Sequence, residues 1–184
     1  MLGRYEALGD KRMDIWIKLL SISDKEGLLK FELTNRKFFE DTCLPRGDSY
    51  YEVQNFNSII EELVQDQEKG LVYMYLIYNN FNEIIGRVNL VDVQRGNFNK
   101  AELGYRIGEI HQGKGYATKA VNLILKEATN KYKLHRIEAG TSINNIASQI
   151  VLIKNGFQFV GKQEKYILLN GKWHDNAIFE KVLD

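Results

Sequence analysis

Apolar residues alternate with polar ones, or run together, in seven stretches of the chain that have the length of strands. These stretches are Met13 to Leu20, Leu71 to Tyr78, Ile84 to Val93, Ala101 to Ile110, His135 to Gly140, Phe157 to Leu169 and Lys172 to Leu183. The Asn79 to Asn82 segment and the Asn170-Gly171 pair are rich in residues that favour tight turns. The pattern therefore predicts hairpins toward both ends of a sheet.

Four other stretches repeat apolar residues every three or four positions, which is the period of a helix. The first is Lys25 to Phe39, which follows Ser23-Asp24, and the second contains Phe56, Ile59, Ile60, Leu63 and Val64 and stops at Gly70. The third is Thr118 to Tyr132, and the fourth is Ile146 to Lys154, which is followed by Asn155-Gly156. Ser-Asp favours a helix start, and Gly or Asn-Gly favours a helix end. Thr42 to Ser49, around Pro45, is predicted to be a loop.

The predicted order is strand, two helices, three strands, helix, strand, helix, two strands. A helix between the strands at 101–110 and 135–140 requires a crossover, which makes those two strands parallel. We therefore predict an α/β fold with a mixed, mostly antiparallel central sheet, a parallel pair in its middle and flanking helices. A chain of 184 residues is long enough for one sizeable core, so a single domain is expected.

The net charge of the chain is close to zero, but the charge is unevenly distributed. The 25 Lys and Arg nearly balance the 24 Asp and Glu, which gives a net of +1 and no indication of direct nucleic-acid binding. Residues 1–70 hold 10 basic and 14 acidic residues, a net of −4, and residues 71–184 hold 15 and 10, a net of +5. The two parts are therefore expected to face different ligands.

Cysteine and histidine usage excludes several kinds of site. Cys43 has no second cysteine to pair with, so disulfide frameworks and multi-cysteine zinc sites are excluded and a cytoplasmic location is expected. His111, His135 and His174 do not have metal-ligand spacing, so no metal is expected. No apolar run approaches about 18 residues and the polar start is unlike a signal peptide, so no membrane association is expected.

The stretch from Ile110 to Thr118 carries the strongest chemical signal. It joins a strand to a helix, and Gly113, Gly115 and Ala117 let the backbone approach a ligand closely. The first amides of a helix, together with its dipole, favour an anion, and Lys114 adds a positive charge. The stretch has neither the Gly-Lys-Ser/Thr of a Walker loop nor the third glycine of a dinucleotide-binding fingerprint. The alternative is that the two glycines only form a tight turn.

The surrounding residues resemble a known superfamily. Gln112-x-x-Gly115-x-Ala117 matches the Q/R-x-x-G-x-G/A motif of the GNAT N-acetyltransferases, and Ala101 to Ile107 resembles their fourth strand. Downstream, His135 to Ala139, Asn145-x-x-Ser148, Asn155-Gly156-Phe157, Gly161 and Tyr166 to Asp175 are similar to the RimJ/RimL branch, which acetylates N-terminal amines of ribosomal proteins. Asn35 to Phe39 with Pro45 resembles the acceptor region of that branch.

The resemblance implies acetyl-CoA as cosubstrate and a division of the chain into acceptor-side helices at about 21–70, an acetyl-CoA-binding core at about 71–160 and a C-terminal hairpin at about 157–184. Strand edge residues would bind the pantetheine arm, loop amides the pyrophosphate, and Asn145 the CoA arm; Asn145 would also suit a helix cap. The implied cofactor-binding residues are Ile107, Gly108, Glu109, Gln112, Gly113, Lys114, Gly115, Tyr116, Ala117, Thr118 and Asn145. Gly108 lies where the parallel strands would splay apart and would suit a bulge.

Two residues are expected to carry the chemistry. Ser148 falls where the RimJ/RimL pattern has a serine near the thioester sulfur, so it is a candidate acid for the departing thiolate, with a bond to the preceding helical turn as the alternative. Leu152 stands where many GNAT enzymes have an acidic tyrosine, and Ile167 stands where RimL-like proteins have a glutamate. Glu102 is the candidate general base, and a surface ion pair is its alternative.

Three functions remain open. The leading one is acetyl transfer to the N-terminal α-amine of a protein, such as a ribosomal protein, by direct attack in a ternary complex, because Cys43 has no neighbouring histidine to activate it for an acyl-enzyme. The second is acetylation of a small amine such as a polyamine or an antibiotic. The third is non-catalytic binding of acyl-CoA. The oligomeric state is open, with a homodimer as one option.

Overall fold

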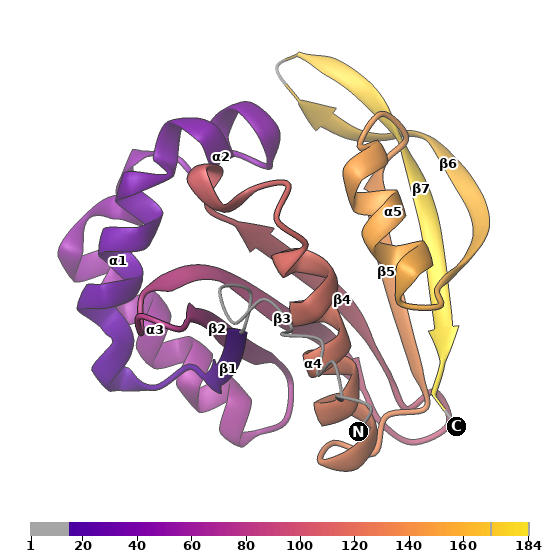
Figure 1. Cartoon of the computed structure of the whole chain (residues 1–184), viewed down its shortest axis with the longest axis horizontal. Coiled ribbons are helices and arrows are strands. Elements are labelled where there is room, and N and C mark those ends of the chain that lie inside the picture. Colours follow the sequence, from indigo (N-terminus) through magenta and orange to yellow (C-terminus); the bar gives the residue numbers. More distant parts are fainter. Residues whose placement is uncertain (1–14, 170, 184) are drawn as a thin grey trace, which may run out of the picture.

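The computed structural model describes residues 15–169 and 171–183, and these residues build one seven-stranded sheet in the order β1-β2-β3-β4-β5-β7-β6 (Figure 1). The strands are β1 (Ile15–Leu19), β2 (Tyr73–Asn79), β3 (Ile84–Gln94), β4 (Lys100–Ile107), β5 (Arg136–Ser142), β6 (Gln158–Leu169) and β7 (Lys172–Val182). β4 and β5 are parallel and the other neighbours are antiparallel. The predicted mixed sheet with a central parallel pair is confirmed.

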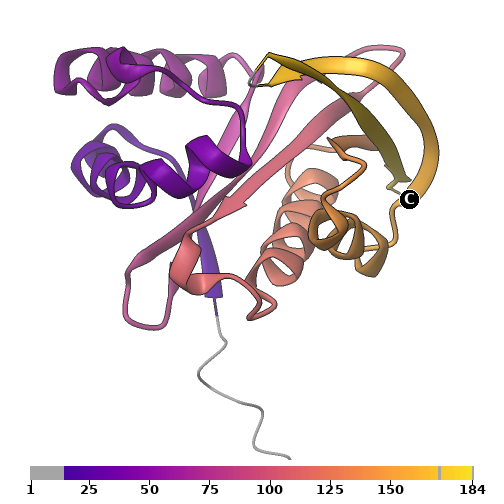
Figure 2. The same ribbon diagram turned by 90° about the horizontal axis from the view of Figure 1, so that it is seen from above.

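Five α-helices and three short 3-10 helices connect the strands within the described residues. The α-helices are α1 (Lys25–Thr34), α2 (Arg36–Thr42), α3 (Val53–Glu68), α4 (Tyr116–Asn130) and α5 (Ile146–Lys154). The 3-10 helices are η2 (Ile22–Asp24), η3 (Asp48–Tyr51) and η4 (Glu109–His111). Seen from above, α1, α2 and α3 cover one face of the sheet, and α4 and α5 cover the other (Figure 2).

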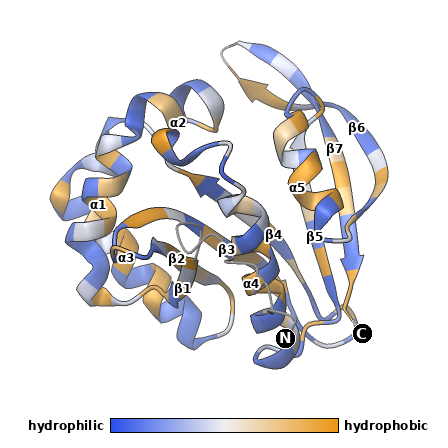
Figure 3. Ribbon diagram, viewed as in Figure 1, coloured by the Kyte–Doolittle hydropathy of each residue, from blue (hydrophilic) through white to orange (hydrophobic). Residues whose placement is uncertain are grey.

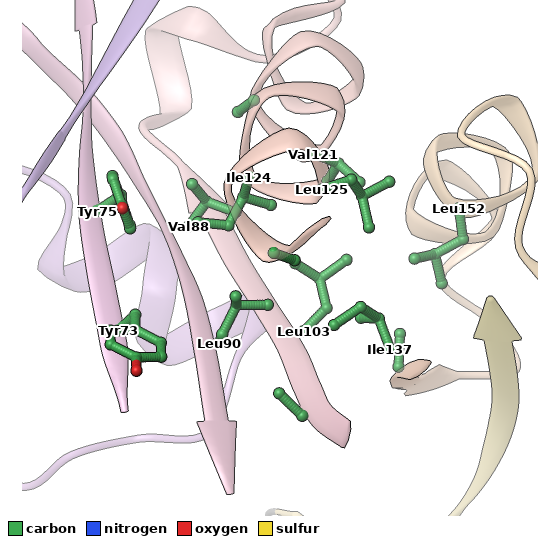
Figure 4. Close-up of a cluster of buried hydrophobic side chains, with 14 of the residues drawn as sticks. Tyr73, Tyr75, Val88, Leu90, Leu103, Val121, Ile124, Leu125, Ile137 and Leu152 are labelled. Atoms are coloured by element: carbon green, nitrogen blue, oxygen red, sulfur yellow. The ribbon is translucent and has the colours of Figure 1, made fainter. Parts of the chain in front are cut away.

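Each layer of helices buries its own apolar core against the sheet. Val88, Leu90 and Leu103 from the strands pack against Val121, Ile124 and Leu125 of α4 and Leu152 of α5 (Figure 4). A second cluster lies under the other layer and includes Leu28, Phe39, Phe56, Ile60 and Leu76. Hydrophobic and hydrophilic positions accordingly alternate along α1 and α3 (Figure 3). The alternation of strand side chains thus assigns one face of β4 to α4 and α5 and the other to α1–α3.

The helix predicted over Lys25 to Phe39 is instead two helices that break at Asn35. The side chain of Asn35 turns back on the helix, because Nδ2 donates to the carbonyl of Phe31 at 2.9 Å. Its Oδ1 accepts from the backbone N–H of Glu109, 2.9 Å away in η4. The periodic pattern continued through this position, but a bond to a distant loop ended α1 there. Asn35 therefore ties the first helical layer to the segment after β4.

Other predicted boundaries moved by a few residues. The strand predicted to end at Ile110 ends at Ile107, and the helix predicted from Thr118 begins at Tyr116. The predicted hairpin at 170–171 is supported by the pairing of Leu169 with Lys172 and by the positive φ of 74° at Gly171. Met13, where the first strand was predicted to start, lies outside the described residues.

Candidate active site

β4 and β5 pair over a short distance and then diverge. Their parallel register covers three residue pairs, the last of which joins Glu102 to Glu138. Beyond this point β5 continues along β7, while β4 remains paired with β3. The edge of β4 from Leu103 to Ile107 that faces β5 therefore has no strand partner among the described residues. An unpaired edge of this kind can take an extended ligand as an added strand.

The segment after this open edge builds a cradle at the start of α4. Gly113 and Gly115 have φ values of 71° and 76°, and a Cβ built on either would meet no atom within 4 Å. The glycines are therefore required by the backbone conformation, and the space in front of them is open. In the described chain, the amides of Gly113, Lys114 and Gly115 have no hydrogen-bond partner. They adjoin the positive end of the α4 dipole, as an anion site requires.

Side chains hold this loop in place from behind. Gln112 Nε2 donates to the carbonyl of Ile107 at 2.6 Å, and Lys114 Nζ donates to the carbonyl of Ile110 at 2.7 Å. Gln112 therefore fixes the loop to the end of the open strand. The motif position therefore needs a long side chain that ends in an N–H donor, which both Gln and Arg have.

The backbone groups of Gly108 and Glu109, which are predicted to contact the pantetheine arm, already have hydrogen-bond partners within the protein. The amide of Gly108 donates to the carbonyl of Ile85, and that of Glu109 donates to Asn35 Oδ1, both at 2.9 Å. Their carbonyls accept from His111 and Gln112 within η4. Gly108 is also not a bulge: a Cβ there would lie 2.9 Å from Asn35 Oδ1, so close packing explains the glycine. Of the predicted residues Ile107 to Glu109, only Ile107 belongs to the open edge.

A cavity of about 260 Å³ lies between β4, α2 and α5, next to the open edge. Tyr105, Asn145 and Ser148 contribute polar groups, and Gln112 and Ala117 belong to the predicted loop. The remaining lining residues are Phe38, Phe39, Thr42, Cys43, Arg106, Ile107, Ala147 and Val151. The cavity thus joins the loop, the open strand and Ser148 to a wall from α2.

Ser148 and Tyr105 form a hydrogen-bonded pair in this cavity. Their hydroxyl oxygens, Ser148 Oγ and Tyr105 Oη, are 2.8 Å apart. Burial raises the pKa of Tyr105, although the hydrogen bond with Ser148 lowers it. The raised pKa keeps the phenol protonated and able to donate a hydrogen bond. Asn145 Oδ1 accepts from the Ser148 amide at 3.0 Å and so caps α5. Ser148 therefore bonds to Tyr105 across the cavity rather than to the preceding helical turn.

Glu102 lies elsewhere. It lines a separate cavity of about 420 Å³ with Asp92, Lys100 and Glu138, and the residues lining this cavity do not overlap with those around Ser148. Partial burial, with Asp92 and Glu138 nearby, raises the pKa of Glu102, and Lys100 opposes the shift. A raised pKa suits a proton acceptor that works near neutral pH. The structure does not bring Glu102 and Ser148 into one cavity.

The positions where the family pattern is broken lie away from the polar centre of the cavity. Leu152, which replaces the usual tyrosine, is 1% exposed and belongs to the core between α5 and the sheet. Ile167 pairs with His174 in the β6–β7 hairpin, where Tyr166 and Trp173 are exposed rather than buried. Leucine and isoleucine side chains cannot act as an acid or a base, so neither position supplies one.

Two residues of this site were not predicted from the sequence. Tyr105 belongs to a predicted strand, but its contact with Ser148 joins residues 43 positions apart, which the strand pattern does not reveal. Arg106 lines the cavity from the opposite face of β4, with its guanidinium 4.7 Å above the Phe39 ring. The alternation of β4 could have suggested that the two side chains flank the splay from opposite faces.

A strand that splays from its parallel neighbour, followed by an amide-lined loop and a helix start, defines an enzyme that binds an anionic cosubstrate with an extended arm. The open amides, the open edge and the absence of any atom in front of Gly113 and Gly115 fit the pyrophosphate and pantetheine of acetyl-CoA. The family model of the acetyltransferase (GNAT) domain matches residues 15–158. The chain therefore belongs to the GNAT acetyltransferases and is an acetyl-CoA-dependent N-acetyltransferase.

The most similar relatives and structures agree with this family. The chain is 36% identical to the probable N-acetyltransferase YjcK of Bacillus subtilis, over 91% of this chain and 93% of that one. It is 26% identical to the [ribosomal protein uS5]-alanine N-acetyltransferase of Escherichia coli, over 88% and 84%. The crystal structure of ribosomal-protein-S5-alanine acetyltransferase from Vibrio fischeri superposes with a TM-score of 0.87 at 26% identity, covering 92% and 93%.

The fold also matches a RimL structure, an L7/L12 α-N-protein acetyltransferase solved in complex with coenzyme A. That match has a TM-score of 0.84 at 20% identity, over 92% of this chain and 94% of that one. Within residues 15–169 and 171–183, no helix is long and apolar enough to cross a membrane, and no group of three or more His, Cys, Asp or Glu is placed to hold a metal ion.

Proposed function

We propose that this enzyme acetylates the N-terminal α-amine of a protein, and that the acetyl group is transferred by direct attack of the amine in a ternary complex. The observation that carries this proposal is the cavity that joins the open edge of β4 to the Tyr105–Ser148 pair and to the α2 wall. Among the relatives, the E. coli enzyme is named for N-acetylation of an alanine of ribosomal protein uS5, which supports a protein acceptor here.

The cosubstrate, when bound, supplies the thioester. The amides from Gly113 to Thr118 hold its pyrophosphate, while the Gln112 amide stays bonded to the carbonyl of Glu109. The open β4 edge at 103–107 aligns its arm, and Asn145 flanks that arm. Alignment is worth about 7–11 kcal/mol in well-oriented systems, so positioning alone can supply much of the rate. An α-amine, with a pKa of about 7.7–8.0, is partly neutral near pH 7, whereas lysine, at about 10.4, is not.

Proton transfers are assigned to three side chains. Ser148 Oγ gives its proton to the departing thiolate and recovers one from Tyr105 Oη across their 2.8 Å hydrogen bond, and the Tyr105 phenol is then reprotonated from solvent. Glu102 accepts the proton of the amine through solvent, from its own cavity on the acceptor side of β4. Cys43 lines the cavity beside Thr42, and no acyl-enzyme on Cys43 is invoked because the described cavity wall has no histidine to activate it.

The proposal is tested with an acceptor panel. Release of CoA thiol from acetyl-CoA is measured with peptides that begin with Ala or Ser, with the same peptides blocked at the N-terminus, and with spermidine. Turnover is expected with the free peptides and not with the blocked ones. Turnover with spermidine alone would contradict the peptide acceptor and favour a small amine.

A further inference from the structure

Two arginines contact a single buried carboxylate on the acceptor side of the sheet, and a third lies near enough to act on them electrostatically. Glu32 of α1 is fully buried; its Oε1 lies 3.2 Å from Arg87 Nε, and its Oε2 lies 3.3 Å from Arg106 Nη1. Arg46 lies 4.4 Å above the Tyr50 ring and acts electrostatically on both Arg87 and Arg106. The cluster therefore carries three positive charges and one negative charge.

Hydrogen bonds do not compensate for this excess. A guanidinium has five N–H donors, yet in the described chain Arg106 makes one hydrogen bond, to Glu32. Arg87 Nε and Glu32 Oε1 are buried without a hydrogen bond, and Arg87 Nη1 reaches only Met74 Sδ at 4.0 Å. Burial and Arg87 lower the pKa of Arg106 to about 10, against the effect of Glu32. The cluster therefore keeps guanidinium donors that Glu32 does not use.

The excess charge borders the catalytic cavity. Arg106 lines the cavity together with Tyr105 and Ser148, and its side chain is 13% exposed there beside Phe39. The described residues that line this cavity include no Asp or Glu. An acceptor that enters between α2 and β4 therefore meets an incompletely neutralised guanidinium next to the place where its amine reacts.

We propose that the acceptor amine also carries a carboxylate, and that Arg106, supported by Arg87 and Arg46, binds this carboxylate at the α2 side of the cavity. This inference rests on the proposed acetyl transfer, because it assigns the carboxylate to the acceptor. The planar fork of a guanidinium matches a carboxylate with two parallel hydrogen bonds, and a lysine would not. The same positive charge disfavours the ammonium form of a nearby amine and so favours its nucleophilic form.

The acceptor class is thus an amino acid or a peptide with an acidic side chain near its N-terminus. Both acceptors, the amino acid and the acidic peptide, carry a carboxylate near the reacting amine. The compounds in the test below distinguish between them. Polyamines and peptides with a basic second residue carry the opposite charge and are disfavoured by the unbalanced arginines.

The test compares kcat/KM between matched acceptors at saturating acetyl-CoA. One series has Ala first and Glu, Gln or Lys second, with an amidated C-terminus; the other pair is free alanine and alaninamide. In at least one series, kcat/KM is expected to be about tenfold higher for the acceptor that bears the carboxylate. This is the usual size of the effect when a charge-assisted hydrogen bond is lost. The series that shows the preference identifies the source of the carboxylate.

Variants separate a specific contact from the general field. Arg106→Gln is expected to abolish the preference, and Arg106→Lys to keep part of it. Arg87 remains paired with Glu32 in both variants. Lys69→Gln is the matched control, because Lys69 is 60% exposed at the end of α3, away from the cavity wall, and its loss removes the same charge from the surface. The preference is expected to survive in this control.

A binding measurement keeps the inference separate from catalysis. The melting temperature of the CoA-loaded protein is expected to rise with the acid form of the acetylated acceptor, to rise less with the amide form, and to lose this difference in Arg106→Gln. Equal kcat/KM across both series, with no such difference in melting temperature, would overturn the carboxylate site and leave acetyl transfer intact. A shift that depends on Arg106 without turnover of any amine would keep the site and contradict the proposed function.

Discussion

At the scale of single residues, the hydrogen bond between Ser148 and Tyr105 leads to a direct prediction about the proposed acid. Ser148→Ala removes the proposed acid and is expected to lower kcat by about 100-fold, the lower end of the range of general acid catalysis. Tyr105→Phe keeps the ring and removes the bond to Ser148, so a smaller loss is expected. Steady-state kinetics at saturating acetyl-CoA measures both. Ser58→Ala, an exposed serine on α3, is the control, and unchanged kcat in Ser148→Ala would leave water as the acid.

Glu102 provides a prediction about pH. Its raised pKa means that the carboxylate becomes protonated, and ceases to be a base, at a higher pH than an ordinary glutamate. The acid limb of the profile of kcat/KM against pH should therefore lie above the usual range of a glutamate. Glu102→Gln should lower kcat by roughly tenfold and remove this limb, while calorimetric affinity for acetyl-CoA stays the same. A wild-type profile in Glu102→Gln would remove Glu102 from the mechanism.

At the scale of elements, the turn between β4 and α4 depends on the left-handed conformation of Gly115. Gly115→Glu places a side chain and a negative charge in the open space of the cradle, so binding of acetyl-CoA should be lost. Gly96→Glu is the matched control, because Gly96 also has positive φ, 69°, and open space around its Cβ position. Both variants carry the backbone strain of about 1 kcal/mol, but only the first should lose affinity by calorimetry. Equal affinities would reject the cradle.

Asn35 couples the first helical layer to this turn. Asn35→Ala leaves the Glu109 amide without its partner and should lower the free energy of unfolding by about 1–2 kcal/mol. Asn35→Asp retains the accepting oxygen and loses only the donor to Phe31, so its loss should be smaller. Urea denaturation measures both. If the two variants were equally stable, the bond between Asn35 and Glu109 would not hold the segment after β4.

Local patterns along the chain predict most elements, but contacts between distant parts of the chain decide several of their ends. Gly113 and Gly115 identified the cradle because a tight turn before a helix has a local signature. The break at Asn35 depends on a bond to Glu109, and the acid pair depends on the distance between β4 and α5. Neither relation is encoded in residues close to one another in sequence, so periodicity could not reveal them.

At the scale of the whole molecule, the division of charge along the sequence has a different meaning in three dimensions. The acidic first part supplies Glu32, which is buried between Arg87 and Arg106 of the basic part. The cavity wall formed by α2 and β4 presents Arg106 rather than the surplus carboxylates of residues 1–70. The charge count along the sequence therefore predicted that the two parts of the chain differ in net charge. It did not predict which charged side chain lines the cavity.

The central claim is that this GNAT fold transfers acetyl to an α-amine held beside Ser148. The most direct measurement is tandem mass spectrometry of a peptide that has both a free α-amine and an internal lysine, incubated with the enzyme and acetyl-CoA. We predict acetylation at the α-amine, matched by CoA release and absent in Gly115→Glu. Acetylation at the lysine instead, or at the α-amine at the same rate in Gly115→Glu, would contradict the account.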